Sequence, residues 1–139
     1  MDLDMLLLEM SRQGFMCAQI MMKLALDIDG KENPDLIRAM SGLNFGMGKT
    51  GSACGALTGG AAALGYFTGQ GEPEELPHSR ASEIIAAYVN WFKDTYHTDT
   101  CHGLIGGDYA ACHTVCPGII MAGYGKVLEL LQEYGIVDD

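Results

Sequence analysis

The chain has 139 residues, of which 48% are hydrophobic and 19% charged, which is enough for one domain with a buried core. Asp and Glu number 18 against 8 Lys and Arg, so the formal net charge is -10. Because nucleic acids and anionic lipid surfaces bind clustered cations, this composition argues against both as partners. Acidic residues at the N-terminus, where a secretion signal would be basic, predict a cytoplasmic protein.

Hydrophobic residues recur at helical spacing along the chain, whereas sustained period-2 alternation is absent. Asn33 is placed to cap a helix that begins at Pro34. The sequence predicts a single all-α domain over residues 1–139, a compact bundle of about five or six helices. The expected helices are 3–13, 15–27, 34–40, 53–67, 78–97 and 117–132, with 42–51 and 98–115 irregular.

One long uncharged segment, 50–71, is about long enough to cross a bilayer. It is rich in Gly, Ala, Ser and Thr, whose transfer into lipid is weakly favourable at best. A buried helix with glycine-rich ends is the better interpretation, and we expect no membrane insertion.

Glycines form one face of the expected helix 53–67. Gly55 and Gly59 follow Gly51 at intervals of four residues. Each glycine inside a helix costs about 1 kcal/mol relative to alanine, so this face needs a packing or functional reason. We expect Gly55 and Gly59 to admit a cofactor or a neighbouring helix, either within the monomer or across a homodimer.

Five cysteines are the strongest chemical signal: Cys17, Cys54, Cys101, Cys112 and Cys116. In a reducing compartment, thiols are kept for metal binding or redox chemistry more often than for structural disulfides. Cys54 and Cys116 fall near the beginnings of expected helices. Free N–H groups and the helix dipole favour the thiolate there, so we expect a lowered pKa for Cys54.

The sequence resembles a known family of proteins. It is similar to the C-GCAxxG-C-C family of redox-active proteins, and the resemblance covers nearly the whole chain. Two sequence runs and two separated C-terminal cysteines carry it: Phe15-Met16-Cys17-Ala18-Gln19 and Cys54-Gly55-Ala56-Leu57-Thr58-Gly59.

The resemblance implies which thiols act. By position, Cys17 and Cys54 match the first two family cysteines and Cys101 the third. Cys116 is expected to be the fourth, because an Ile-Ile pair and a helix follow it, and Cys112 is its alternative.

Two forms of chemistry remain open for these thiols. Four cysteines suit an iron–sulfur cluster, and a related domain accompanies the haem domain of split-Soret cytochromes, where such a centre is implicated. Without a metal, Cys54 and Cys17 would form a dithiol/disulfide relay with Cys54 as the attacking thiolate. The alternative is a non-catalytic helical binding module with a structural zinc, or with free thiols buried in the core and no cofactor. The redox partner is not specified by the sequence.

Overall fold

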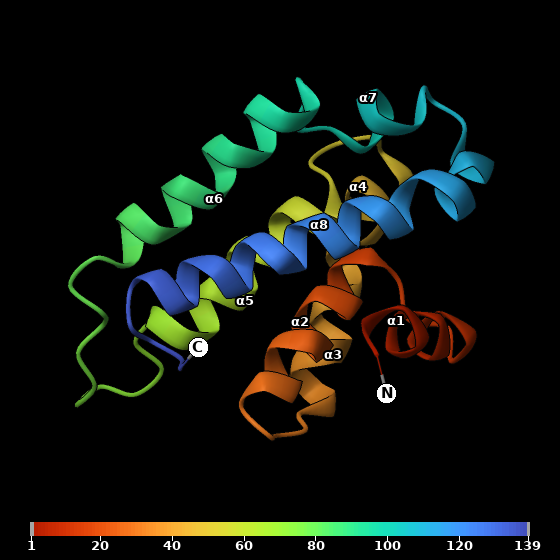
Figure 1. The fold of residues 1–139 in the computed structure, drawn as a ribbon. Coiled ribbons are helices and arrows are strands. Elements are labelled where there is room, and N and C mark those ends of the chain that lie inside the picture. The colour runs from red at the N-terminus through yellow and green to blue at the C-terminus, as the bar shows by residue number, and fades with distance from the viewer. Residues whose placement is uncertain (1, 139) are drawn as a thin grey trace.

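The computed structural model describes residues 2–138, and the all-α prediction is confirmed for this part of the chain (Figure 1). Two short 3-10 turns, Ser41–Leu43 and Tyr109–Ala111, join the longer elements. The labelled helices are α1 Leu3–Arg12, α2 Cys17–Ile28, α3 Pro34–Met40, α4 Asn44–Lys49, α5 Gly55–Thr68, α6 Ala81–Tyr96, α7 Cys101–Ile105 and α8 Cys112–Glu133. Since α4 has left-handed φ and ψ angles, the described residues form seven right-handed α-helices rather than five or six.

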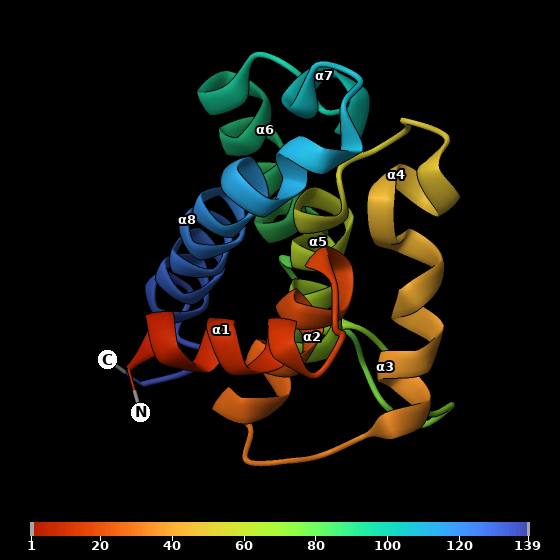
Figure 2. The ribbon, with the colours of Figure 1, turned by 90° about the vertical axis from the view of Figure 1, so that its right-hand side faces the viewer.

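Helix α5 lies in the middle of the bundle, packed against α2, α6 and α8 (Figures 1 and 2). The glycine face predicted from the sequence is one reason. A Cβ at Gly59 would lie 2.9 Å from Ala18 Cα, so α2 and α5 touch backbone to backbone. Gly60 lies outside the predicted face and is turned toward α6, where a Cβ would collide with the ring of Tyr88. Helix α5 can therefore approach α2 and α6 this closely only because glycine, which has no side chain, occupies both positions.

Tyr88 of α6 contacts both α5 and α8. It is fully buried, and its hydroxyl donates a 2.7 Å hydrogen bond to the Ala56 carbonyl in the first turn of α5. A Cβ at Gly123 of α8 would lie 2.8 Å from the same hydroxyl. The ring therefore fills the space that Gly60 and Gly123 leave open.

Several boundaries differ from the sequence prediction. The helix expected from residue 78 begins at Ala81, and α8, with 22 residues, is longer than α6. Pro117 does not begin the last helix but lies inside it, five residues after Cys112. The segment 98–115, expected to be irregular, contains α7, whose N-cap Thr100 accepts a hydrogen bond from the Gly103 N–H.

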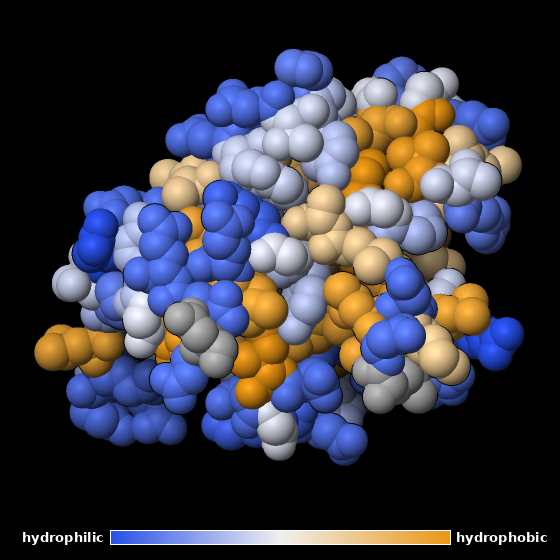
Figure 3. Space-filling view, viewed as in Figure 1, coloured by the Kyte–Doolittle hydropathy of each residue, from blue (hydrophilic) through white to orange (hydrophobic). Residues whose placement is uncertain are grey.

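Hydrophobic residues reach the surface over α7 and the beginning of α8, and again beside α8 where it passes α2 (Figure 3). The segment Tyr109–Glu133 is long and apolar enough, by length and composition alone, to cross a membrane. Core helices of soluble proteins meet the same criterion, and α8 contacts α2, α5 and α6 along its length.

Candidate functional site

All five cysteines line one cavity of about 290 Å³ at the end of the bundle where α2, α5 and α7 begin. Cys17 is the first residue of α2, Cys101 the first of α7, and Cys54 caps α5. Cys112 and Cys116 reach the cavity from the first turns of α8. Residues up to 99 positions apart in sequence are thus gathered at one place.

A short antiparallel contact brings Cys54 and Cys101 together. The Cys54 N–H donates to the Asp99 carbonyl at 2.8 Å, and the Cys101 N–H donates to the Ser52 carbonyl at 2.7 Å. An isolated bridge between Ala53 and Thr100 lies between them. Because α5 begins directly after Cys54 and α7 begins at Cys101, this backbone pairing fixes the beginnings of the two helices relative to one another.

Between these elements the chain makes a left-handed turn. Phe45, Gly46, Met47, Gly48 and Lys49 all have φ between 57° and 77°. A left-handed helical conformation costs roughly 1–2 kcal/mol for each residue that has a Cβ. Three such residues, alternating with two glycines, therefore need strong support from their surroundings.

Contacts with the cysteine segments supply that support. The Gly46 carbonyl accepts hydrogen bonds from the Ser52 N–H at 3.1 Å and from the Thr50 hydroxyl at 2.7 Å. A Cβ at Gly46 would lie 2.6 Å from Cys101 Cβ, so the turn presses directly on α7. Phe45 lines the same cavity as Cys17, and burial raises the pKa of that thiol while the Phe45 N–H acts to lower it. The left-handed turn therefore lies between Cys17 and Cys101 and holds both.

Asn44 connects Cys17 to the rest of the bundle. Its buried side-chain oxygen accepts the Ala18 N–H at 3.1 Å and lies 4.0 Å from the Cys17 thiol. Its amide nitrogen donates to the Gln19 side chain at 3.0 Å. Asn44 was not predicted from the sequence, where its only signal is an amide residue at the beginning of a glycine-rich loop.

The two candidate cofactor-binding glycines occupy different environments. A Cβ at Gly55 would collide with the Cys17 sulfur, so Gly55 leaves room for that thiol at the cavity wall. Gly59 lies one helical turn further along, against the α2 backbone at Ala18, and is not among the described residues that line the cavity. Of these two glycines, Gly55 is therefore the one that leaves room beside a thiol of the cavity.

Cys112 and Cys116 form a pair on one side of α8. They are four residues apart and both line the cavity, and the Cys112 thiol adds to the effect of burial in raising the pKa of Cys116. Pro117 follows at once and has no N–H to donate to the His113 carbonyl one turn earlier. The turn that carries these two thiols is therefore joined to the rest of α8 by one helical hydrogen bond fewer.

Burial dominates the electrostatics of the thiols. It raises the pKa of Cys54 to about 11 from an ordinary 9.0, outweighing the Leu57 and Ala56 N–H groups, which act to lower it. Burial also raises the pKa of Cys17, Cys101 and Cys116, and the nearby thiols add to the effect. The expectation of a lowered pKa at Cys54 is therefore wrong, because desolvation exceeds the helix N-terminal effect here.

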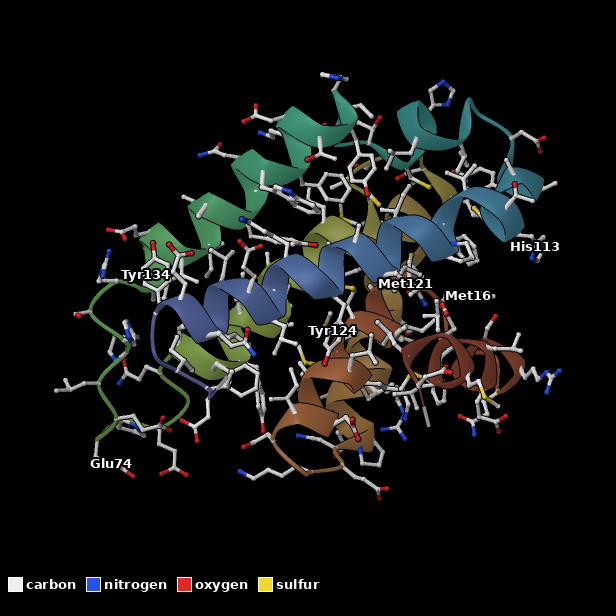
Figure 4. The ribbon with its side chains drawn as sticks, in the orientation of Figure 1. Met16, Glu74, His113, Met121, Tyr124 and Tyr134 are labelled. Carbon is white, nitrogen blue, oxygen red and sulfur yellow. The ribbon has the colours of Figure 1, made fainter. Side chains whose placement is uncertain are left out.

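Polar and aromatic groups also line the cavity, among them Phe45, Lys49, Tyr109 and His113. The Lys49 ammonium lies 5.3 Å from the Phe45 ring centroid and 5.8 Å from that of Tyr109, and the two rings meet edge to face. His113 lines the cavity but is exposed, and projects outward from the first turn of α8 (Figure 4). Tyr109 had no sequence signal, since only the fold brings it to Phe45.

Thiolates are soft donors that suit zinc or iron–sulfur centres, so the residues present fit such a group. Among residues 2–138, no three His, Cys, Asp or Glu side chains already stand in a metal-binding arrangement. The cavity thus collects the donors without presenting a closed ligand set.

Comparison with known families agrees with this arrangement of cysteines. Residues 15–130 match the family described as "Putative redox-active protein (C_GCAxxG_C_C)". The chain belongs to this family. The matched range includes all five cysteines of this C_GCAxxG_C_C protein and its left-handed turn. No curated protein and no solved structure matches the chain.

Proposed function

We propose that the protein is a redox protein whose cysteine thiolates bind an iron–sulfur cluster in the cavity at the end of the bundle. One observation carries the proposal: five cysteines from four separate parts of the chain line a single cavity. Small soluble domains rarely gather that many thiols unless they bind a metal or exchange electrons.

The surroundings of the thiols support metal ligation. Cys54 and Cys101 are buried, and apolar residues of α8 such as Ile119 and Ile120 form part of the same wall. Several thiolates in such a place repel one another and lose hydration, so a bound cation would compensate for both costs. Low solvent access would also tune the potential of a cluster.

The ligands divide into a fixed group and an adjustable group. Cys17, Cys54 and Cys101 are each held by backbone hydrogen bonds or close contacts at the beginning of a helix. Cys112 and Cys116 share the turn before Pro117. We propose Cys17, Cys54 and Cys101 as ligands, with Cys116 as the fourth and Cys112 as its alternative.

Metal and sulfide analysis of anaerobically purified protein tests the proposal. We expect iron and acid-labile sulfide together with visible absorption, and we expect Cys54→Ser to lose all three while retaining its helical circular dichroism. Matched Cys112→Ser and Cys116→Ser variants then identify the fourth ligand, since only one of them should lose the cluster. Zinc without sulfide in the wild type, or a Cys54→Ser variant with a full cluster, would refute it.

A second candidate rests on the thiols of Cys112 and Cys116, which lie about one helical turn apart on α8 and line the same cavity. Two thiols that lie this close can lose two protons and two electrons to an oxidised thiol partner and form a disulfide. Thiol counting after equilibration with a glutathione redox buffer tests this dithiol function. Loss of two thiols that map to one cysteine pair, in protein that never contains iron, would favour it over the cluster.

A further inference from the structure

A second cavity, of about 500 Å³, is lined by residues of α2, of α3 and of the loop that joins these two helices, and none of its described lining residues is a cysteine. Apolar residues, including Leu26, Pro34 and Ile37, form part of its lining. Lys23, Lys31 and Arg38 line it as well. Binding sites for small molecules have this size and this combination of an apolar surface with a few charged groups.

The cations of this α2–α3 groove are unusual in an acidic protein. The chain has only 8 Lys and Arg, and three of them are here. Lys31 pairs with Asp29 at 3.2 Å and Arg38 with Asp35 at 2.6 Å, and all four side chains are in contact with solvent. Exposed pairs of this kind are weak and can exchange a carboxylate for another anion.

Lys23 differs from the other two cations. It is half-buried, its ammonium lies 4.4 Å from the Phe15 ring centroid, and it has no carboxylate within ion-pair distance among residues 2–138. Glu32 is the one acidic residue that the groove's described lining includes. The groove therefore offers a partly desolvated positive charge above an aromatic ring.

The groove is connected to the cysteine-lined cavity in two ways. Phe15 lines both cavities and so forms a common wall. Gln19, which lines the groove, donates to the Ile37 carbonyl at 3.3 Å and accepts from the Asn44 amide at 3.0 Å. Asn44 in turn lies 4.0 Å from the Cys17 sulfur. A ligand that moves Phe15 or Gln19 therefore changes the surroundings of Cys17.

We propose that the α2–α3 groove binds a small organic anion, a molecule with an apolar body and a phosphate or carboxylate group. The apolar part would lie on Ile37 and Leu26, while its anionic group would pair with Lys23 and be reached by Arg38 or Lys31. Occupancy of the groove would alter the reactivity of Cys17 through Gln19.

Ligand pairs that differ in charge test this site. Flavin mononucleotide and riboflavin form the phosphate pair, and indole-3-acetate and 3-methylindole form the carboxylate pair. We expect the anion of at least one pair to bind about tenfold more tightly than its neutral partner in equilibrium dialysis. The pair that shows this difference identifies the anionic group, and its absence in both pairs would overturn the proposal.

Matched variants locate the binding. Lys23→Met keeps the apolar stem and removes the charge, so it should abolish the preference for the anion. Lys93→Gln on α6, which removes a cation outside the groove, should retain it. Equal loss in both variants, or no loss in Lys23→Met, would show that the preference is not due to this groove.

The rate of Cys17 alkylation, measured in metal-free protein so that the thiol is available, supplies a second readout. With the tighter-binding anion at saturation, we expect that rate to change at least twofold in the wild type and to stay constant in Lys23→Met. An unchanged rate in the wild type would refute the connection through Gln19. Because Cys54→Ser should bind the anion normally, failure of the groove and failure of the cluster proposal are distinguishable.

Discussion

In the middle of the bundle, α5 meets α2 and α6 through glycines whose missing side chains leave room for a backbone and a tyrosine ring. At the cysteine end, the same helix meets its neighbours through a left-handed turn and a single antiparallel bridge. The first region is regular helix packing that gains its stability from buried surface. The second is held by individual hydrogen bonds and tolerates strain. Favourable packing in the bundle therefore offsets the backbone strain at the cysteine end, where the strained turn positions the thiols.

The largest effect is expected where the regular packing is closest. Gly60→Leu should destabilise the protein by at least about 4 kcal/mol, because the new side chain has no room beside the buried Tyr88 ring. Gly65→Ala on the same helix meets no atom within 4 Å and should stabilise by up to about 1 kcal/mol. Urea unfolding measures both, and similar stabilities for the two variants would contradict the glycine packing.

The next effect concerns the left-handed turn. Gly46→Ala should cost about 3 kcal/mol, since it adds strain at φ 64° and a contact of 2.6 Å with Cys101 Cβ. Gly48→Ala has φ 77° but no atom within 4 Å, so it should cost only about 1 kcal/mol. Urea unfolding compares the pair. Equal losses would show that the turn does not press on α7.

The free energy of unfolding should depend on pH because the thiol of Cys54 is buried. The pKa of Cys54 is about 11 in the fold and close to 9.0 when unfolded, so the unfolded state releases its proton first as pH rises. The stability contributed by the neutral thiol is complete below pH 9 and is lost between pH 9 and 11, by about 2 kcal/mol. Denaturation of metal-free protein across this range should show the loss, and Cys54→Ala should lose less.

The smallest effect is expected at Pro117. Pro117→Ala restores an N–H that can donate to the His113 carbonyl, so the first turn of α8 should exchange its amide hydrogens more slowly. Global stability should rise by about 1 kcal/mol. Hydrogen exchange measures the local change. If Cys112 and Cys116 need a loosely attached turn, reaction of the two thiols with iodoacetamide should also become slower.

The sequence alone determined the helical class, the Asn33 cap of α3 and the use of the glycine face. These features depend on local periodicity and on residue size, both of which can be read from the sequence itself. The sequence also singled out the five cysteines. It did not find α7 or the extension of α8 before Pro117, because each depends on partners distant in sequence, such as the pairing of segment 51–54 with 99–102.

Only the tertiary structure decided how the thiols behave. A helix start favours a thiolate when it is in contact with water, and the sequence showed the helix start near Cys54. Burial against α2 and α7 reversed the sign of the pKa shift, because desolvation of a charge is a property of the surroundings rather than of the local backbone. The left-handed turn was likewise set by Asn44, Cys17 and Cys101, whose contacts outweigh the backbone preference of its residues.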